Sequence, residues 1–311
     1  MIGVILRPIM FRTTKEIILS TASSSINASS GQLNTGSIFF IGNATVLIRY
    51  AGFTILTDPT FIHMHEKVNL GFGLYTKRLT NPAINIEQLL PLDLVILSHF
   101  HGDHFDQVAV RELDKSFPIV TTPHAAEELS LRGFTNPQQL EKWESISFVK
   151  GNIRLQIIAT PGRHGPFPVA MFLPKVMGSI LDFKIKGYRN DSNSNNNSHN
   201  SDQLFRIYIT GDTMVFDDIQ EIPKRYPNVD LALLHLGGTT IMGIMLTMDA
   251  KEGLEMFKII NPKKVIPIHY NDYDVFKSPI EDFQAKVKEA GIEDHVFYMQ
   301  HGETYTFDVN R

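Results

Sequence analysis

Three histidines and one aspartate lie within six residues of one another, directly after an apolar segment that is typical of a buried β-strand. The stretch is 94–107, LVILSHFHGDHFDQ, and the four side chains are those of His99, His101, Asp103 and His104. Side chains two residues apart in an extended chain point the same way, so the first two imidazoles can reach one point. Gly102 permits a sharp turn that can direct the other two side chains to the same region.

Imidazole and carboxylate groups this close together suit a divalent metal ion such as zinc. The alternative is a polar loop whose histidines cluster by chance. Because only 12 of the 311 residues are histidine, three of them in six positions favour the metal site.

The pattern His-x-His-x-Asp-His resembles the signature of the metallo-β-lactamase-fold superfamily. This resemblance implies three later ligands in the order His, Asp, His, each at the end of a strand. The chain contains such residues in the motifs TPGRHG, TGD and IPIH, namely His164, Asp212 and His269. Each could by itself be an ordinary loop or strand-end residue, but their order after the first cluster favours a shared site.

The resemblance also implies how the ligands are divided between two divalent metal ions. His99, His101 and His164 would hold one ion, Asp103, His104 and His269 the other, and Asp212 would bridge them. Zinc is the leading candidate, with manganese and iron as alternatives. The implied reaction is hydrolysis by a hydroxide shared between ions about 3.5–4 Å apart.

Further residues are candidates for supporting roles. Asp103 and His235, the latter in LLHLGG, could donate a proton to the leaving group, although His235 could equally be a packed strand-end histidine. Asp58, in LTDP, is expected behind the site, where it would orient a metal ligand; the alternative is a turn cap before proline. Asp272 and Tyr273 could face substrate or belong to a turn.

Other histidines are weak candidates for metal binding. His63 and His65 have no nearby carboxylate except Glu66, and the long segment 61–85 is better interpreted as a loop over the mouth of the active site. His199 lies in the polar tract DSNSNNNSHNSD, which has nothing to bury.

Composition narrows the class of protein. Hydrophobic residues make up 43% of the chain, enough for a sizeable core, and the net charge of −4 gives no reason to expect nucleic-acid binding. There is no cysteine, which excludes disulfides and fits an intracellular, cytoplasmic protein. The sequence contains no run of about eighteen apolar residues, so it predicts no membrane-spanning helix. The apolar segment 1–11 is the one part of the leader that could contact a membrane.

The order of predicted elements indicates the architecture. Residues 1–36 are predicted to be a flexible leader, with a targeting segment as the alternative, and 37–311 one domain with a disordered insertion at 186–203. A meander of short strands comes first, and strands alternating with helices follow, including strands at 169–173 and 296–299. This order suggests two sheets face to face with helices outside, and the resemblance sharpens it to the four-layered αββα sandwich of the metallo-β-lactamase type, an α/β fold.

Within the superfamily, the closer resemblance is to the branch that contains L-ascorbate-6-phosphate lactonase and N-acyl-phosphatidylethanolamine phospholipase D. It rests on FIGNATVLIRYAGFTILTDP, SHFHGDHFD, ITGDT and TMDAKEG followed by NPKKVIPIHY. Asn43 departs from the histidine common in that branch. The expected activity is hydrolysis of a small-molecule ester, lactone or phosphodiester; the alternative is a mononuclear iron oxidoreductase or a non-catalytic metal-binding protein. The sequence does not give the oligomeric state.

Overall fold

The computed structural model describes residues 15–19, 33–185 and 203–309. Most of the expected leader and almost all of the expected insertion, including His199, lie outside these residues. Within the leader, Lys15–Ile18 forms strand β1, which pairs in parallel with β10. These four residues were predicted to be flexible. They are ordered as an edge strand because their backbone N–H and C=O groups pair with those of β10. The division into leader and domain otherwise stays a prediction.

One sheet has seven strands and begins with the predicted meander. Its order is β18-β2-β3-β4-β7-β8-β9, antiparallel from β18 to β4 and parallel from β4 to β9. The strands are β2 (Thr35–Gly42), β3 (Thr45–Tyr50), β4 (Phe53–Thr57), β7 (Leu94–Ile96), β8 (Ile119–Thr121), β9 (Pro137–Gln139) and β18 (Thr304–Asp308).

The other sheet also has seven strands, in the order β1-β10-β11-β12-β13-β14-β17. Strands β10 to β13 are antiparallel, whereas β13, β14 and β17 are parallel. They are β10 (Ser145–Lys150), β11 (Ile153–Thr160), β12 (Gly178–Ile185), β13 (Gln203–Ile209), β14 (Leu231–His235) and β17 (Lys264–Ile268).

Both sheets are apolar on both faces, because one face of each packs against the other sheet and the opposite face is covered by helices. In β3, Val46 and Ile48 pack between the sheets, whereas Leu47 between them packs outward under helices α2 (Gln107–Glu112) and α3 (Pro123–Leu131). The alternation follows the two-residue period of a strand. On the far side, α4 (Glu221–Arg225), α5 (Ala250–Ile260) and α6 (Ile280–Ala290) cover the other sheet.

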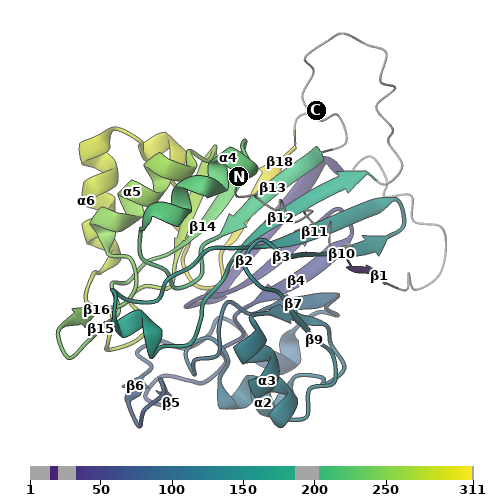
Figure 1. Cartoon of the computed structure of the whole chain (residues 1–311). Helices are drawn as coiled ribbons and strands as arrows, with labels where there is room; N and C mark the ends of the chain where they lie inside the picture. The colour runs from purple at the N-terminus through teal and green to yellow at the C-terminus, as the bar shows by residue number, and fades with distance from the viewer. Residues whose placement is uncertain (1–14, 20–32, 186–202, 310–311) are drawn as a thin grey trace, which may run out of the picture.

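The layers are therefore helix, sheet, sheet, helix, which confirms the predicted αββα sandwich (Figure 1). Helices α5 and α6 lie on one side of the paired sheets, and α2 and α3 on the other. Across the described part of the chain, no helix has both the length and the apolar character needed to cross a bilayer.

Two predicted strands are wrong. Val169–Met171 is a 3-10 helix, η2, in the loop between β11 and β12. Of the predicted strand, Val169, Phe172 and Leu173 line a cavity and pair with no sheet. Residues 296–299 form no strand; only an isolated bridge joins Val296 to Val265. The long segment 61–85 contains a small hairpin, β5 (Lys67–Asn69) and β6 (Tyr75–Lys77), and a second hairpin is made by β15 (Thr240–Ile241) and β16 (Ile244–Met245).

The direction of the strands brings their carboxyl ends together. Strands β4 and β7 run parallel in one sheet, as do β13, β14 and β17 in the other. Strand β11 is antiparallel to β12, which is antiparallel to β13, so β11 ends at the same edge as β13. The loops that follow these strands therefore meet at one edge of the sandwich, as happens generally in sheets of this kind.

The packing of the two sheets on each other can be tested at Phe183. This side chain is fully buried between the sheets, with its ring centroid 5.0 Å from that of Tyr50 and 6.1 Å from that of Phe53. We expect Phe183→Ala to lower the free energy of unfolding by about 3–5 kcal/mol, because it removes buried surface and leaves a cavity. Denaturant titration measures this. Leu131→Ala, at a side chain that is 75% exposed, is the control and should change the value by less than about 0.5 kcal/mol; a similar effect of both substitutions would contradict the packing described.

Candidate metal centre

All seven residues predicted to bind metal lie together at this edge of the sandwich, and all are buried. The first four follow β7, and one each follows β11, β13 and β17. They form two adjacent groups, in each of which the nearest donor atoms lie within 4.8 Å of one another. The groups are His99, His101 and His164, and Asp103, His104, Asp212 and His269.

The first group consists of three imidazoles. The Nε2 atom of His99 lies 2.9 Å from Nδ1 of His101, and the ring of His164 lies 5.1 Å from that of His99 and 5.2 Å from that of His101, centroid to centroid. Burial is the main cause that lowers the pKa of all three side chains, and the neighbouring histidines also lower it for His99 and His101. The pKa of His101 falls to about 3 as a result. Neutral imidazoles are the form in which histidine binds a metal ion.

The second group adds two carboxylates. Asp212 places Oδ2 3.2 Å from Nε2 of His104 and Oδ1 3.5 Å from Nδ1 of His269, while Asp103 places Oδ2 3.6 Å from Nε2 of His269. Burial alone would raise the pKa of both carboxyls, but the adjacent histidines hold them below the usual range. Burial alone would likewise lower the pKa of His104 and His269, but these carboxylates raise it.

Backbone carbonyls fix the tautomers of two of the histidines. The Nδ1 atom of His164 lies 3.1 Å from the carbonyl oxygen of Leu246, and Nδ1 of His269 lies 3.2 Å from that of Leu236. Because a carbonyl oxygen only accepts, Nδ1 carries the proton in both rings. When these rings are neutral, their Nε2 atoms carry the free lone pair that a metal ligand requires.

Asp58 lies behind the second group, as predicted. Its Oδ2 is 3.2 Å from Nδ1 of His104 and 3.3 Å from Nε2 of His235, and its Oδ1 accepts the backbone N–H of Ser98 at 2.7 Å. Burial would raise the pKa of this carboxyl, but the two histidines lower it to about 2. Asp58 therefore holds the ring of His104 as an ionised acceptor.

His235 was predicted to contact substrate, but it is buried behind the candidate metal centre. Its side chain is fully buried, Nδ1 is 3.2 Å from the hydroxyl oxygen of Thr210, and Nε2 faces Asp58. It lines neither of the two cavities that reach the centre. Among the expected proton donors, only Asp103 lies at a cavity wall.

Asn43 has a role that the sequence did not indicate. Its backbone lies in the left-handed region, at φ 54°. Its side-chain Nδ2 donates to the carbonyl oxygen of Asp103 at 2.6 Å, and its own carbonyl accepts the N–H of His269 at 2.8 Å. Its N–H donates to Asp272 at 2.7 Å. Asn43 thus joins two ligand-bearing loops, and a left-handed conformation is one that asparagine adopts more readily than most residues.

The remaining candidates lie away from the centre. Asp272 is buried as the acceptor for Asn43, and Tyr273 is buried in a small apolar cluster, so both have packing roles. His63 contacts Asn85 at 3.0 Å, and neither it nor His65 belongs to a group of metal-binding geometry among the described residues.

The atoms of the centre fit a bound cation. Across the described residues, several buried polar atoms make no hydrogen bond, and those in the two groups are Nε2 of His101, His104 and His269 and Oδ1 of Asp103 and Asp212. A buried polar atom without a partner is costly. Two of the five face a carboxylate, since Nε2 of His104 lies 3.2 Å from Asp212 and Nε2 of His269 lies 3.6 Å from Asp103. All five are of types that bind zinc, manganese or iron, so together they fit a metal site.

Comparison with known proteins agrees with this geometry. Residues 54–270 match the model of the beta-lactamase superfamily domain. UPF0173 protein YddR of Bacillus subtilis is 28% identical over 282 residues, which cover 86% of this chain and 98% of that protein. A Thermus thermophilus protein named as a UPF0173 metal-dependent hydrolase is 27% identical over 272 residues, with the same coverage. The crystal structure of isothiocyanate hydrolase from Delia radicum gut bacteria has a similar fold, with a TM-score of 0.70 at 23% identity over 88% of this chain and 100% of that one.

The position of Asp58 predicts a specific effect on metal affinity. In Asp58→Asn, the amide NH₂ would face at least one of the N–H groups that now donate a hydrogen bond to the carboxylate. His104 would also lose its ionised partner. We expect metal affinity to fall by about 10- to 100-fold, the usual cost of losing such a partner. Titration against a competing chelator measures it. Asp218→Asn, at a partly exposed carboxylate paired with Lys142, is the control; equal affinity in the two variants would show that Asp58 does not orient a ligand.

Proposed function

Because the chain belongs to the β-lactamase superfamily, we propose that it is a metal-dependent hydrolase acting on a small ester, lactone or phosphodiester. The observation that carries this proposal is the convergence of buried imidazole and carboxylate atoms that lack hydrogen-bond partners. Two of the relatives described above are named as hydrolases. The resemblance to the lactonase and phospholipase branch remains a prediction and does not choose among the three substrate classes.

The two groups of ligands divide naturally between two ions. His99, His101 and His164 would hold one, and Asp103, His104 and His269 the other. Asp212 would be shared, since it contacts the second group directly and its charge also acts on His99 in the first. Zinc remains the leading candidate, and manganese or iron would also suit these ligands.

When bound, such a pair of ions supplies an activated water and a Lewis acid for the substrate oxygen. The chain's own residues do the rest. His164 and His269 are fixed in one tautomer by backbone carbonyls, and His104 is held by Asp58, so the ligands are oriented before substrate arrives. In ester hydrolysis, water adds to the acyl carbon, the carbon–oxygen bond breaks, and the products are an acid and an alcohol.

The leaving alcohol needs the proton that the attacking water loses. Asp103 is the proposed carrier, because its Oδ1 atom has no hydrogen-bond partner and its side chain lines a cavity. His235 is proposed as a positioning residue instead, because its Nε2 faces Asp58, its ring packs beside those of His104 and His269, and it lines neither cavity.

The dinuclear proposal is tested by Asp212→Ala. We expect the wild type to bind about two metal ions per chain and the variant about one or none, with hydrolysis of esters, lactones and phosphodiesters lost, because the shared carboxylate is removed. Elemental analysis measures the bound metal, and a substrate panel measures hydrolysis. Asp218→Ala is the control and should keep both the metal ions and the activity. Activity that survives in Asp212→Ala, or a wild type with one iron and oxygen uptake, would overturn the proposal; stable metal without turnover would indicate a binding protein.

A further inference from the structure

A cavity of about 320 Å³ opens directly onto the candidate metal centre. Four of the residues lining it belong to the centre: His101, Asp103, His164 and Asp212. Apart from Thr239, the other lining residues are all apolar, among them Leu74, Phe172 and Met242. A group bound here would therefore have the metal ligands on one side and hydrocarbon on the others.

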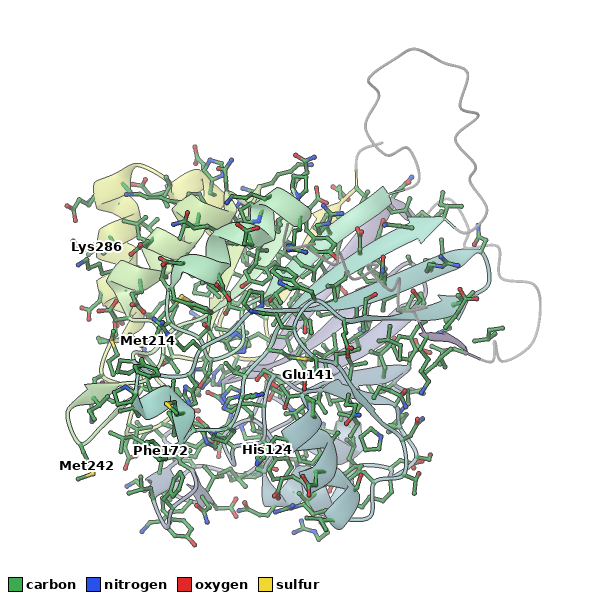
Figure 2. All side chains as sticks on the ribbon, in the orientation of Figure 1. His124, Glu141, Phe172, Met214, Met242 and Lys286 are labelled. Atoms are coloured by element: carbon green, nitrogen blue, oxygen red, sulfur yellow. The ribbon has the colours of Figure 1, made fainter. Side chains whose placement is uncertain are left out.

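Three separate segments supply the apolar wall. They are the β5–β6 hairpin, the segment around η2, and the β15–β16 hairpin with Leu246 just after it. Phe172 and Met242, from two of these segments, lie at the same edge of the molecule (Figure 2). Their side chains are 72% and 90% exposed. Exposed apolar side chains gathered around one opening mark a binding site.

The wall contains no lysine or arginine among the described residues. Arg163 is next to His164 in the sequence, but its guanidinium lies over the ring of Phe216, 4.6 Å from the centroid, and contacts the carbonyl oxygen of Val215 at 3.5 Å. An anionic group in this cavity would have no side-chain cation to pair with beyond the metal ions themselves. Burying an unpaired charge is costly.

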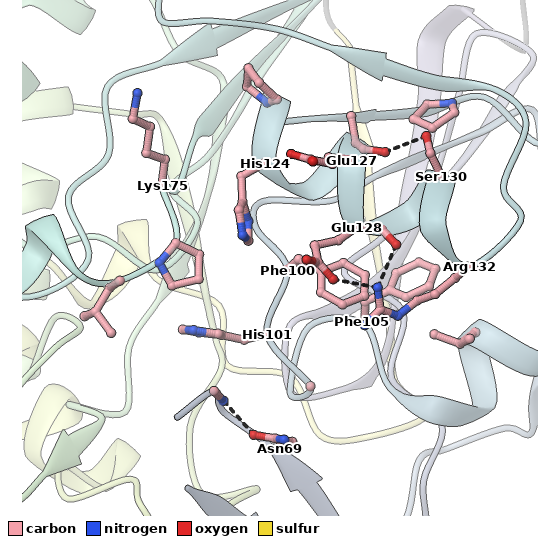
Figure 3. A pocket seen from close by; sticks show the side chains of 18 of the residues that line it. Asn69, Phe100, His101, Phe105, His124, Glu127, Glu128, Ser130, Arg132 and Lys175 are labelled. Atoms are coloured by element: carbon pink, nitrogen blue, oxygen red, sulfur yellow. Dashed lines mark hydrogen bonds and ion pairs between the residues drawn. The ribbon is translucent and has the colours of Figure 1, made fainter. Parts of the chain in front are cut away.

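A second, larger cavity of about 1210 Å³ differs from the first in having charged side chains in its wall. It also reaches His101, and its lining mixes apolar residues with charged ones, including Glu127, Glu128, Arg132 and Lys175 (Figure 3). Two of these are already paired, since Nη1 of Arg132 lies 2.6 Å from a carboxylate oxygen of Glu128. The two cavities meet at His101, Phe72, Phe172 and Leu173, which line both.

We propose that the smaller cavity binds an uncharged hydrocarbon part of the substrate, next to the bond that is cleaved. The proposal rests on the proposed hydrolase function and narrows its substrate class to molecules whose group beside the cleaved bond is uncharged. The cavity lies at the lower end of the range of about 300–1,000 Å³ for small-molecule sites, so the hydrocarbon part is short. A charge on this hydrocarbon part, away from the cleaved bond, is what the wall fits least.

Matched substrates test the charge preference. The 4-nitrophenyl ester of hexanoic acid and the mono-4-nitrophenyl ester of hexanedioic acid have the same chain, but the second ends in a carboxylate. We expect kcat/KM to be about tenfold or more higher for the neutral ester, because the carboxylate would be buried without a partner. Equal kcat/KM for the two esters, or a preference for the anionic ester, would overturn the assignment.

A pair of variants tests the wall itself. Leu74 and Leu79 are 39% and 42% exposed and lie five residues apart, but only Leu74 lines the cavity. Leu74→Lys should reduce the preference for the neutral over the anionic ester by about tenfold, because the ammonium group supplies the missing partner. Leu79→Lys should leave the preference unchanged. The same change in both variants, or in neither, would contradict the proposal.

A binding measurement separates this inference from the proposed function. Linear alcohols from butan-1-ol to hexan-1-ol, titrated into chelator-treated protein and followed by ligand-observed NMR, should gain about fourfold in affinity per methylene group. Leu74→Lys should abolish the gain. If the alcohols bind in this way but no ester is hydrolysed, the hydrolase proposal fails and the cavity assignment stands. If metal-dependent hydrolysis occurs without a chain-length or charge preference, the cavity assignment fails alone.

Discussion

The rest of the structure depends on one constraint: the carboxylate charges buried at the candidate metal centre must be balanced by positive charge. Asp103 and Asp212 are excluded from water, yet the surrounding histidines hold their pKa values low, so both carboxyls are ionised there. An ionised carboxylate in such a place requires positive charge close by. Protonated His104 and His269 can supply it in the metal-free chain, and divalent ions can supply it when bound. The donor atoms left without hydrogen bonds are the part of this arrangement that is able to bind metal ions.

The sandwich fold allows many polar groups to be buried together at one place. Strands from both sheets end at the same edge, so the ligands come from loops whose first residues are fixed by fully buried strands. Contacts from further residues then hold the loops in place. Asn43 joins the loops of Asp103 and His269, and Asp58 joins the loop of His104 to the end of β14. Rigid supports of this kind keep ligands oriented without help from the metal.

The first four candidate ligands could be predicted from the sequence because their signal is local, whereas His164, Asp212 and His269 were predicted through the resemblance to a superfamily. Histidine and aspartate at fixed spacing after apolar runs mark strand ends, and the same alternation of apolar residues predicts most of the strands. The cavity wall could not be predicted, because Leu74, Phe172 and Met242 come from three loops whose meeting depends on the whole fold. Residues 169–173 were predicted to be a strand for the same reason, since an apolar run has no periodicity that separates a wall from a sheet. The depth of His235 likewise depends on Asp58, which lies 177 residues away in the chain.

Anomalous diffraction from crystals of the metal-loaded protein tests the central claim most directly. The account predicts two peaks in the anomalous map, about 3.5–4 Å apart, one beside His164 and the other beside His269, with Asp212 between them. A single peak, or peaks that do not contact these three side chains, would contradict it.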